Sequence, residues 1–296
     1  RAEEAIRRAE VLVAGNRIAA IGTRGSFPLP DGVEIRDVSG RWLLPGFIDT
    51  HAHWFGIRRS VLDPEPWEFL ANLAYGVTSG LDVQSFTADV FAYQDLLDAG
   101  LMIGPRAYST GPGVFVDSGI DSADDARAVL ARYRDHYRTR NVKAYMMGNR
   151  AQRRAFIEAA HAMGMLPTTE GASDARLNLS HAVDGFAGNE HTLPVSPLRA
   201  DVIALLAGTG ISYTPTFQVL YGGRQALDAM IIAHVPQDDP KVRRFIPGDV
   251  VQAKTEYRRW SRPQDQDYPR FARGGPAVRP APTSHSTVIT PNAARM

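Results

Sequence analysis

Two histidines separated by one residue, His51 and His53, are the residues whose type and spacing most clearly suggest chemistry. They follow a short apolar stretch, and in a strand residues i and i+2 point to the same face. Paired imidazoles at a strand end suit a borderline divalent ion such as Zn²⁺. Asp49, two residues earlier on that face, could orient one of them. The alternative is two ordinary polar residues that end a strand, and the preceding PGFIDT argues against it.

The segments around this pair predict strands that alternate with helices. Strand-like apolar runs begin at Phe47 and recur at 77–83, 106–110, 142–147, 165–169, 178–186 and 211–217. Helical patterns cover 65–75, 87–100, 122–139, 150–163 and 198–208. Ser122 is a suitable N-cap for one of these helices, and Gly100 and Gly164 suit the ends of two others. Alternation with short connections predicts an α/β fold with a parallel sheet.

The first part of the chain predicts β structure of a different kind. Two apolar runs meet at a Gly15-Asn16 turn, which is a hairpin signal, and a short strand over 33–38 follows. The seven strands counted from Phe47 fall one short of the eight that a closed (β/α)₈ barrel needs.

Composition narrows the classes of protein and partner. The 296 residues are 44% hydrophobic and 22% charged, which excludes a largely disordered or coiled-coil chain. A formal charge of +1 gives no reason to expect nucleic acid or an anionic membrane as partner. The absence of cysteine excludes disulfides, Fe–S clusters and thiol nucleophiles. No run reaches the ~20 apolar residues of a membrane helix. Because the chain begins at Arg1, the compartment stays open, with the cytoplasm favoured.

The stretch LLPGFIDTHAH, residues 43–53, resembles the first barrel strand of the amidohydrolase superfamily of metal-dependent hydrolases. VLVAGNRIAAIG resembles half of the small β-sandwich that accompanies that barrel, and YGVTSGLDV, residues 75–83, resembles its second-strand segment. Within the superfamily the chain most resembles the imidazolonepropionase-like amidohydrolases, and among these the branch that is often fused behind a TolB-like β-propeller. The resemblance implies a partial β-sandwich over 1–45 and an incomplete TIM-like (β/α)₈ barrel over 46–235. The Pro-rich segment 236–296 would be irregular and poorly ordered.

The resemblance also implies metal ligands on later strands. In many members a fourth-strand lysine, carboxylated on its side-chain nitrogen, bridges two metals, and Lys143 occupies that position. A lysine in a buried apolar strand is costly unless paired or neutralised, so a structural salt bridge is the alternative. The fifth-strand ligand is normally histidine, but here the strand ends in Glu170. Its carboxylate could bind Zn²⁺ or Mn²⁺ instead, or contact the ligands or the substrate.

His181, within the run 178–186, matches the sixth-strand histidine that completes the family's ligand set. A histidine packed in the core is the alternative. Just beyond it, Glu190 and His191 fall on a loop at the barrel face that usually carries substrate contacts. The predicted metal ligands are therefore His51, His53, Lys143, Glu170 and His181, and the predicted catalytic residues are Lys143, Glu170 and His191.

This set implies a hydrolase that cleaves carbon–nitrogen bonds other than peptide bonds, such as those of cyclic amides, through a metal-activated water. One or two divalent ions are expected, with Zn²⁺ favoured over Mn²⁺ or Fe²⁺. The substrate would be a small molecule, with neither nucleic acid nor membrane as partner. Homo-oligomerisation is left open.

A second hypothesis comes from the end of the chain. The family usually supplies a catalytic aspartate on an eighth strand, and no strand ending in aspartate follows Phe217. His285, the last histidine, lies in Pro-rich sequence and is not expected to be a ligand. Seven strands leave an open edge, so the chain could instead be a catalytically incompetent fragment of a longer amidohydrolase.

Overall fold

The computed structural model describes residues 6, 8–54, 57, 62–115, 119–171, 174–216 and 236–260. The chain divides into two compact units, and the boundary lies between Pro45 and Gly46. In the described part of the chain, no helix is both long and apolar enough to cross a membrane.

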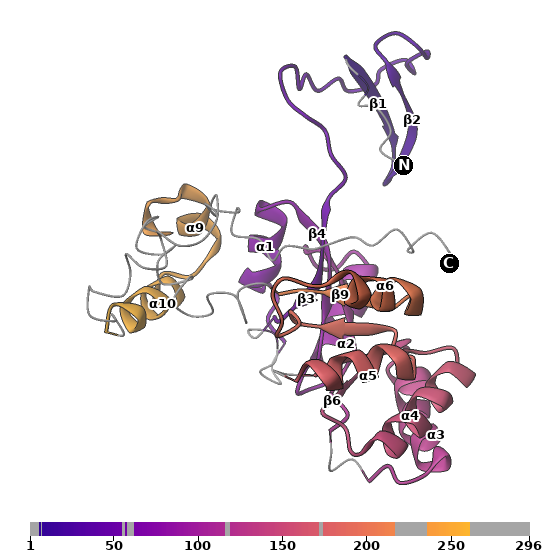
Figure 1. Ribbon diagram of the computed structural model, residues 1–296. Helices are drawn as coiled ribbons and strands as arrows, with labels where there is room; N and C mark the ends of the chain where they lie inside the picture. Colours follow the sequence, from indigo (N-terminus) through magenta and orange to yellow (C-terminus); the bar gives the residue numbers. More distant parts are fainter. Residues whose placement is uncertain are drawn as a thin grey trace. The chain divides into compact units, whose positions relative to one another are not determined.

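The first unit contains the predicted hairpin. Strands β1 (Ala9–Ala14) and β2 (Arg17–Thr23) pair antiparallel (Figure 1). Gly15, at the turn between them, has φ +59°, a left-handed conformation that glycine adopts without strain. The strand predicted over 33–38 is wrong, because those residues lie in an irregular segment that pairs with no described strand. Two of its apolar side chains, Ile35 and Val38, are exposed.

The second unit is built on parallel strands that follow one another in chain order. The first sheet comprises β3 (Phe47–Ala52), β4 (Val77–Asp82) and β5 (Arg106–Ser109). The second comprises β6 (Asn141–Tyr145), β7 (Leu166–Glu170), β8 (Gly188–Glu190) and β9 (Ser212–Thr214). Every neighbouring pair is parallel, which confirms the predicted α/β class. Among the described residues, no pairing joins β9 to β3, as barrel closure would require.

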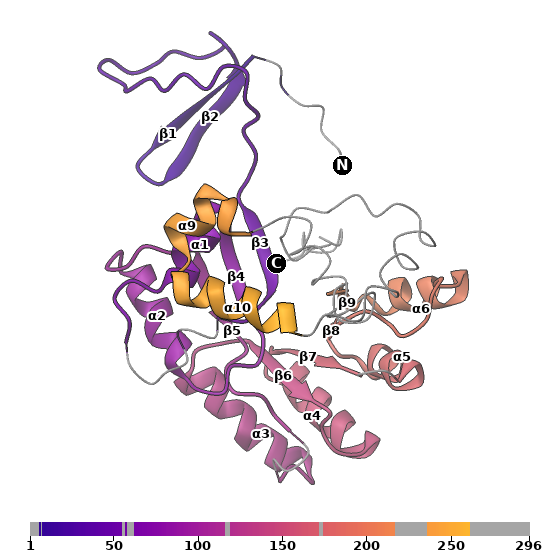
Figure 2. The same ribbon diagram turned by 90° about the vertical axis from the view of Figure 1, so that its left-hand side faces the viewer.

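Helices follow the strands, and Figure 2 shows α2 to α6 on the outer side of the strands. The described helices of this region are α1 (Trp67–Ala74), α2 (Asp89–Asp98), α3 (Ala123–Ala131), α4 (Arg150–Ala162), α5 (Ala175–Asp184) and α6 (Ala200–Thr209). Ser122 caps α3 as predicted, in a reciprocal pair with Asp125. A π-helical turn, Arg132–His136, extends α3. Buried side chains such as Leu130, Val142 and Phe156 join α3 and α4 to β6.

The strand predicted over 178–186 is wrong, because this segment forms most of helix α5. Asp174 caps the helix by accepting hydrogen bonds from the N–H groups of Arg176 and Leu177. The helix ends at Gly185, which has φ +99°. Its buried residues, Asn178, His181 and Ala182, follow the i, i+3, i+4 spacing of a helix face. The sixth parallel strand is instead β8, which begins three residues after Gly185.

The prediction of an irregular segment is also wrong for residues 236–260. A 3₁₀ turn (Pro236–Asp238) precedes α9 (Pro240–Phe245) and α10 (Gly248–Trp260). Asp239 caps α9, and Pro240 opens it at a position that needs no backbone N–H, so these residues start a helix. Helix α9 packs on α1, where Lys241 Nζ donates to the Ala74 carbonyl at 2.7 Å. Phe217 lies outside the described residues, and so do residues 261–296, which include His285.

Candidate metal centre

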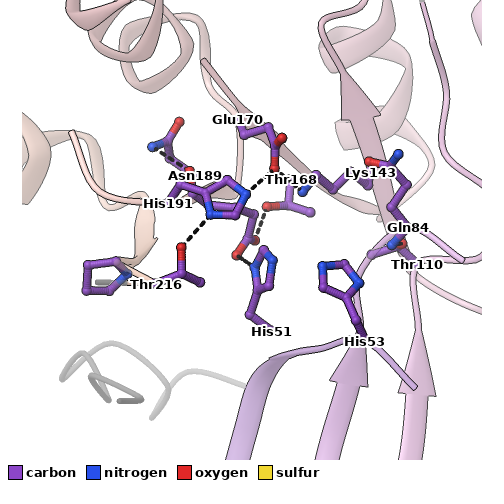
Figure 3. Close-up of polar contacts among 12 residues, drawn as sticks. His51, His53, Gln84, Thr110, Lys143, Thr168, Glu170, Asn189, His191 and Thr216 are labelled. Atoms are coloured by element: carbon purple, nitrogen blue, oxygen red, sulfur yellow. Dashed lines mark hydrogen bonds and ion pairs between the residues drawn. The ribbon is translucent and has the colours of Figure 1, made fainter. Parts of the chain in front are cut away.

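The carboxyl ends of the parallel strands bring together the polar side chains of the site (Figure 3). Strand β3 supplies His51 and leads into His53, β6 supplies Lys143, and β7 ends at Glu170. Strand β8 ends at Glu190, and His191 follows it. Parallel strands present these ends at one face, where α/β folds build their sites. Five of the six predicted site residues therefore lie in one connected group, and His181 is the exception.

The two histidines of the HxH motif lie side by side. The ring centroids of His51 and His53 are 4.9 Å apart, with the ring planes nearly perpendicular. His51 is buried, whereas 35% of the His53 side chain is exposed. Asp49 does not contact either ring in the manner we predicted, because its carboxylate accepts a hydrogen bond from the His51 backbone N–H at 3.0 Å.

The ring of His51 is held by Glu190. Its Nδ1 lies 2.8 Å from Glu190 Oε2, and both side chains are about 95% buried, with exposed fractions of 4% and 6%. Thr168 donates its hydroxyl hydrogen to the other Glu190 oxygen at 2.5 Å. The opposite ring nitrogen, His51 Nε2, is buried and has no hydrogen-bond partner among the described residues. The sequence pointed to Glu190 only as part of a loop, since the contact joins residues 139 positions apart.

Glu170 has a different environment, in which one carboxylate oxygen serves two partners. Lys143 Nζ donates to Glu170 Oε2 at 2.6 Å, and His191 Nε2 lies 2.8 Å from the same oxygen (Figure 3). Burial acts to raise the pKa of Glu170, but the His191 hydrogen bond and the Lys143 charge outweigh it and lower that pKa to about 2. Lys143 is buried in β6, and its ammonium makes the salt bridge that the sequence left open as an alternative.

His191 contacts Glu170 on one side and lies near the ring of His51, the partner of Glu190, on the other. Its ring centroid is 4.9 Å from that of His51, and its Nδ1 makes a hydrogen bond with the Thr216 hydroxyl. Its backbone φ of +69° is uncommon for a residue with a side chain and is the kind of strain found at functional sites. His191 follows the sixth strand directly, so it occupies the place in the fold that the sequence assigned to His181.

His181 lies on α5 and packs against Phe186, with ring centroids 5.1 Å apart. Burial, with a further contribution from the charge of Arg153, lowers the pKa of His181 to about 4. Within the described region neither ring nitrogen has a hydrogen-bond partner. The reason for placing His181 in the ligand set was wrong, because the residue lies on a helix rather than on the sixth strand.

The donor atoms at this face suit a divalent ion. Three imidazoles and a carboxylate are the ligands that Zn²⁺ takes in proteins. A buried imidazole nitrogen without a hydrogen bond, such as His51 Nε2, is unfavourable unless something binds it. In the described part of the chain, no three His, Asp or Glu side chains are arranged as a metal-ligand group. Glu170 instead faces Lys143 and His191.

Comparisons with known proteins agree with this architecture. No protein-family model matches the chain. An imidazolonepropionase of Caulobacter vibrioides is 26% identical over 234 residues, which cover 68% of this chain and 56% of that protein. An adenine deaminase of Deinococcus deserti is 33% identical over 135 residues, covering 44% of this chain and 22% of that protein. The chain thus spans little more than half the length of the first relative and less of the second.

A solved structure shares the fold. Molinate hydrolase superposes with a TM-score of 0.59 at 12% identity, covering 82% of this chain and 72% of that one. The parallel strands β3 to β8, each followed along the chain by a helix, agree with that likeness in fold. By these sequence relatives and this fold, the chain is similar to members of the amidohydrolase superfamily.

Proposed function

We propose that this chain is a metal-dependent hydrolase that cleaves carbon–nitrogen bonds other than peptide bonds in small molecules, with cyclic amides as the leading class. The observation that carries the proposal is the group of three imidazoles, in which the ring centroids of His53 and His191 each lie 4.9 Å from that of His51, together with the buried Nε2 of His51, which has no hydrogen-bond partner among the described residues. The similarity to an imidazolonepropionase and an adenine deaminase supports the choice of bond.

The metal would be held by His51, His53 and His191, with Glu170 as the anionic ligand. Zn²⁺ suits this donor set best, and Mn²⁺ or Fe²⁺ are alternatives. When bound, such an ion activates water and polarises a carbonyl group. For Glu170 and His191 to serve as ligands, the hydrogen bond that joins them must open. His191 thus takes the place of His181 in the proposed set.

We further propose that one ion is bound rather than two. A second ion in the predicted arrangement would need Lys143 as a carboxylated, anionic ligand. That anion would lie beside the carboxylate of Glu170, which the ammonium of Lys143 now contacts at 2.6 Å. Since like charges at this distance repel, the pair favours an uncarboxylated Lys143 that holds Glu170 ionised and oriented.

The substrate would approach from the side of His53 and His191. These two side chains are 35% and 23% exposed, whereas His51 is almost fully covered. An ionised Glu170, with 13% of its side chain exposed, can accept a hydrogen bond from a substrate N–H or from a water. The low pKa of Glu170 makes it a weak proton store while Lys143 and His191 contact it.

The experiment is metal analysis combined with a hydrolysis assay on the purified chain. After incubation with Zn²⁺ and removal of the excess, we expect close to one equivalent bound and turnover of a cyclic amide such as an imidazolone. His51→Ala should lose both. His136→Ala, which removes an exposed histidine of the π-helical turn, is the matched control and should keep both.

Two results would count against the proposal in different ways. Binding of Zn²⁺ without turnover of any cyclic amide would favour the alternative of a catalytically incompetent fragment. Absence of binding in a folded chain would remove the metal site itself. Two equivalents of metal, both lost in Lys143→Ala, would overturn the single-ion assignment and favour a carboxylated lysine.

A further inference from the structure

Glu190 is a buried carboxylate that the proposed chemistry does not itself use. It lies at the end of β8 with 6% of its side chain exposed, and each of its two oxygens has one partner. One oxygen contacts His51 Nδ1 at 2.8 Å, and the other accepts the hydroxyl hydrogen of Thr168 at 2.5 Å. A buried carboxylate without such contacts would be strongly unfavourable, so both contacts are integral to the site.

The contact with Glu190 bears on where the ring hydrogen of His51 lies. Because a carboxylate oxygen accepts hydrogen bonds, the 2.8 Å contact is satisfied when His51 carries its ring hydrogen on Nδ1. A neutral imidazole has one ring hydrogen, and Nε2 is then left with its lone pair free. Nε2 is the atom that is buried and has no hydrogen-bond partner among the described residues.

The backbone around Glu190 is shaped to hold this arrangement. Gly188 is paired in register with Thr168, and a Cβ at Gly188 would lie 2.6 Å from Thr168 Oγ1. Residues 188 and 190 are two apart on the strand and face the same side, so the missing side chain leaves room for the Thr168–Glu190 hydrogen bond. Gly188 thus permits β8 and β7 to approach closely enough for Thr168 to reach Glu190.

We infer that Glu190 is a positioning residue: with Thr168 behind it, it fixes His51 as the Nδ1–H tautomer and aims the Nε2 lone pair into the metal centre. The identity of the metal in this inference rests on the proposed function, whereas the tautomer of His51 does not. Carboxylates that accept from the outer nitrogen of a ligating histidine fix its tautomer and increase its basicity, and their loss typically weakens metal binding about 10- to 100-fold.

The test has two measurements on the full chain. The first is the tautomer of His51 in the metal-free protein at neutral pH, from long-range ¹H–¹⁵N correlation spectra, with the signal assigned by its loss in His51→Ala. We expect Nδ1–H and an unprotonated Nε2. Observation of the Nε2–H tautomer in the wild-type chain would overturn the inference without any variant having to fold.

The second measurement is Zn²⁺ affinity by competition with a chromophoric chelator. Glu190→Gln keeps the size of the side chain but removes the pure acceptor, so we expect affinity to fall about 10- to 100-fold and the Nδ1–H signal to be lost. Glu158→Gln, on the exposed face of α4, is the matched control and should change neither. Thr168→Val should show a smaller loss in the same direction.

The outcomes separate the two proposals. Unchanged Zn²⁺ affinity and tautomer in a folded Glu190→Gln chain would overturn the role of Glu190 while leaving the metal site in place. An Nδ1–H tautomer in a wild-type chain that binds no Zn²⁺ would support the positioning role and overturn the proposed function. Loss of both affinity and tautomer in the variant supports both.

Discussion

The Glu190 and Glu170 carboxylates lie at the ends of neighbouring strands, yet their surroundings differ. Glu190 distributes its two oxygens between a histidine and a threonine, and its side chain is almost completely buried. Glu170 shares one oxygen between an ammonium and a histidine and is 13% exposed. The contact with Glu190 orients the ring of His51, whereas the contact with Lys143 neutralises the negative charge of Glu170.

This difference suggests separate tasks for the two groups. A residue that orients a ligand needs fixed, fully used hydrogen bonds, as Glu190 has. A residue that contacts the metal or the substrate must be able to exchange partners, and the oxygen of Glu170 that serves both Lys143 and His191 gives that freedom. Substitutions at Lys143, His181 and Thr168 test this contrast, and the largest effect is expected at Lys143.

Lys143→Met should destabilise the chain by about 3 kcal/mol or more, because it leaves the carboxylate of Glu170 without its cation in a largely buried position. Urea unfolding followed by circular dichroism measures the loss. The double variant Lys143→Met/Glu170→Gln should recover part of it, since the uncompensated charge is gone. If Lys143→Met were as stable as the wild type, the Lys143–Glu170 ion pair would contribute nothing to the free energy of unfolding. The proposed difference between Glu170 and Glu190 would then be wrong.

His181 offers a further comparison, because it is buried like His51 but has no carboxylate in hydrogen-bond contact among the described residues. Its pKa is lowered to about 4 in the folded chain, against 6.5 as the ordinary value. Below pH 6.5 the unfolded state therefore binds more protons, so stability should fall as the pH decreases from about 6.5 to 4, by up to about 3 kcal/mol.

Unfolding curves measured across this pH range, for the wild type and His181→Phe, provide the test. The variant should lose this part of the pH dependence, whereas replacement of the exposed His161 by Phe should not. Equal pH dependence in the wild type and His181→Phe would show that His181 titrates normally.

Thr168→Val should give the smallest effect, a loss of about 1.5 kcal/mol in the free energy of unfolding. It removes one hydrogen bond to the buried carboxylate of Glu190, while the contact between Glu190 and His51 remains. Thr168→Ser retains the hydroxyl and should remain within about 0.5 kcal/mol of the wild type. Thermal or urea unfolding distinguishes the two. Equal destabilisation by Val and Ser would assign the effect to packing of the methyl group rather than to the hydrogen bond.

Much of the site could be predicted from local sequence. The HxH motif spans only three residues, and the strand period alone predicts that both rings lie on one side. Lys143 was recognisable because an ammonium within an apolar strand needs a partner, and the ion pair with Glu170 is the alternative that the sequence left open. The hairpin and the cap at Ser122 also depend only on neighbouring residues, and the structure confirms both.

Three predictions failed. The apolar run 178–186 predicted a strand, but burial at 178, 181 and 182 follows a helix. Segment 33–38 has an apolar pattern but pairs with no described strand. The Pro-rich segment from 236 onward predicted irregular structure, yet Asp239 and Pro240 start helix α9. Local patterns do not reveal which face of a segment becomes buried.

The sequence by itself determined the chemistry available at this site: paired imidazoles, a buried lysine, two glutamates and a further histidine, on strands that alternate with helices. Only the tertiary structure decided the partners. It placed His191 rather than His181 after the sixth strand and joined Glu190 to His51 across 139 positions. The physical reason is that pairing of parallel strands, which brings distant strand ends to one face, depends on register and packing over the whole sheet rather than on neighbouring residues.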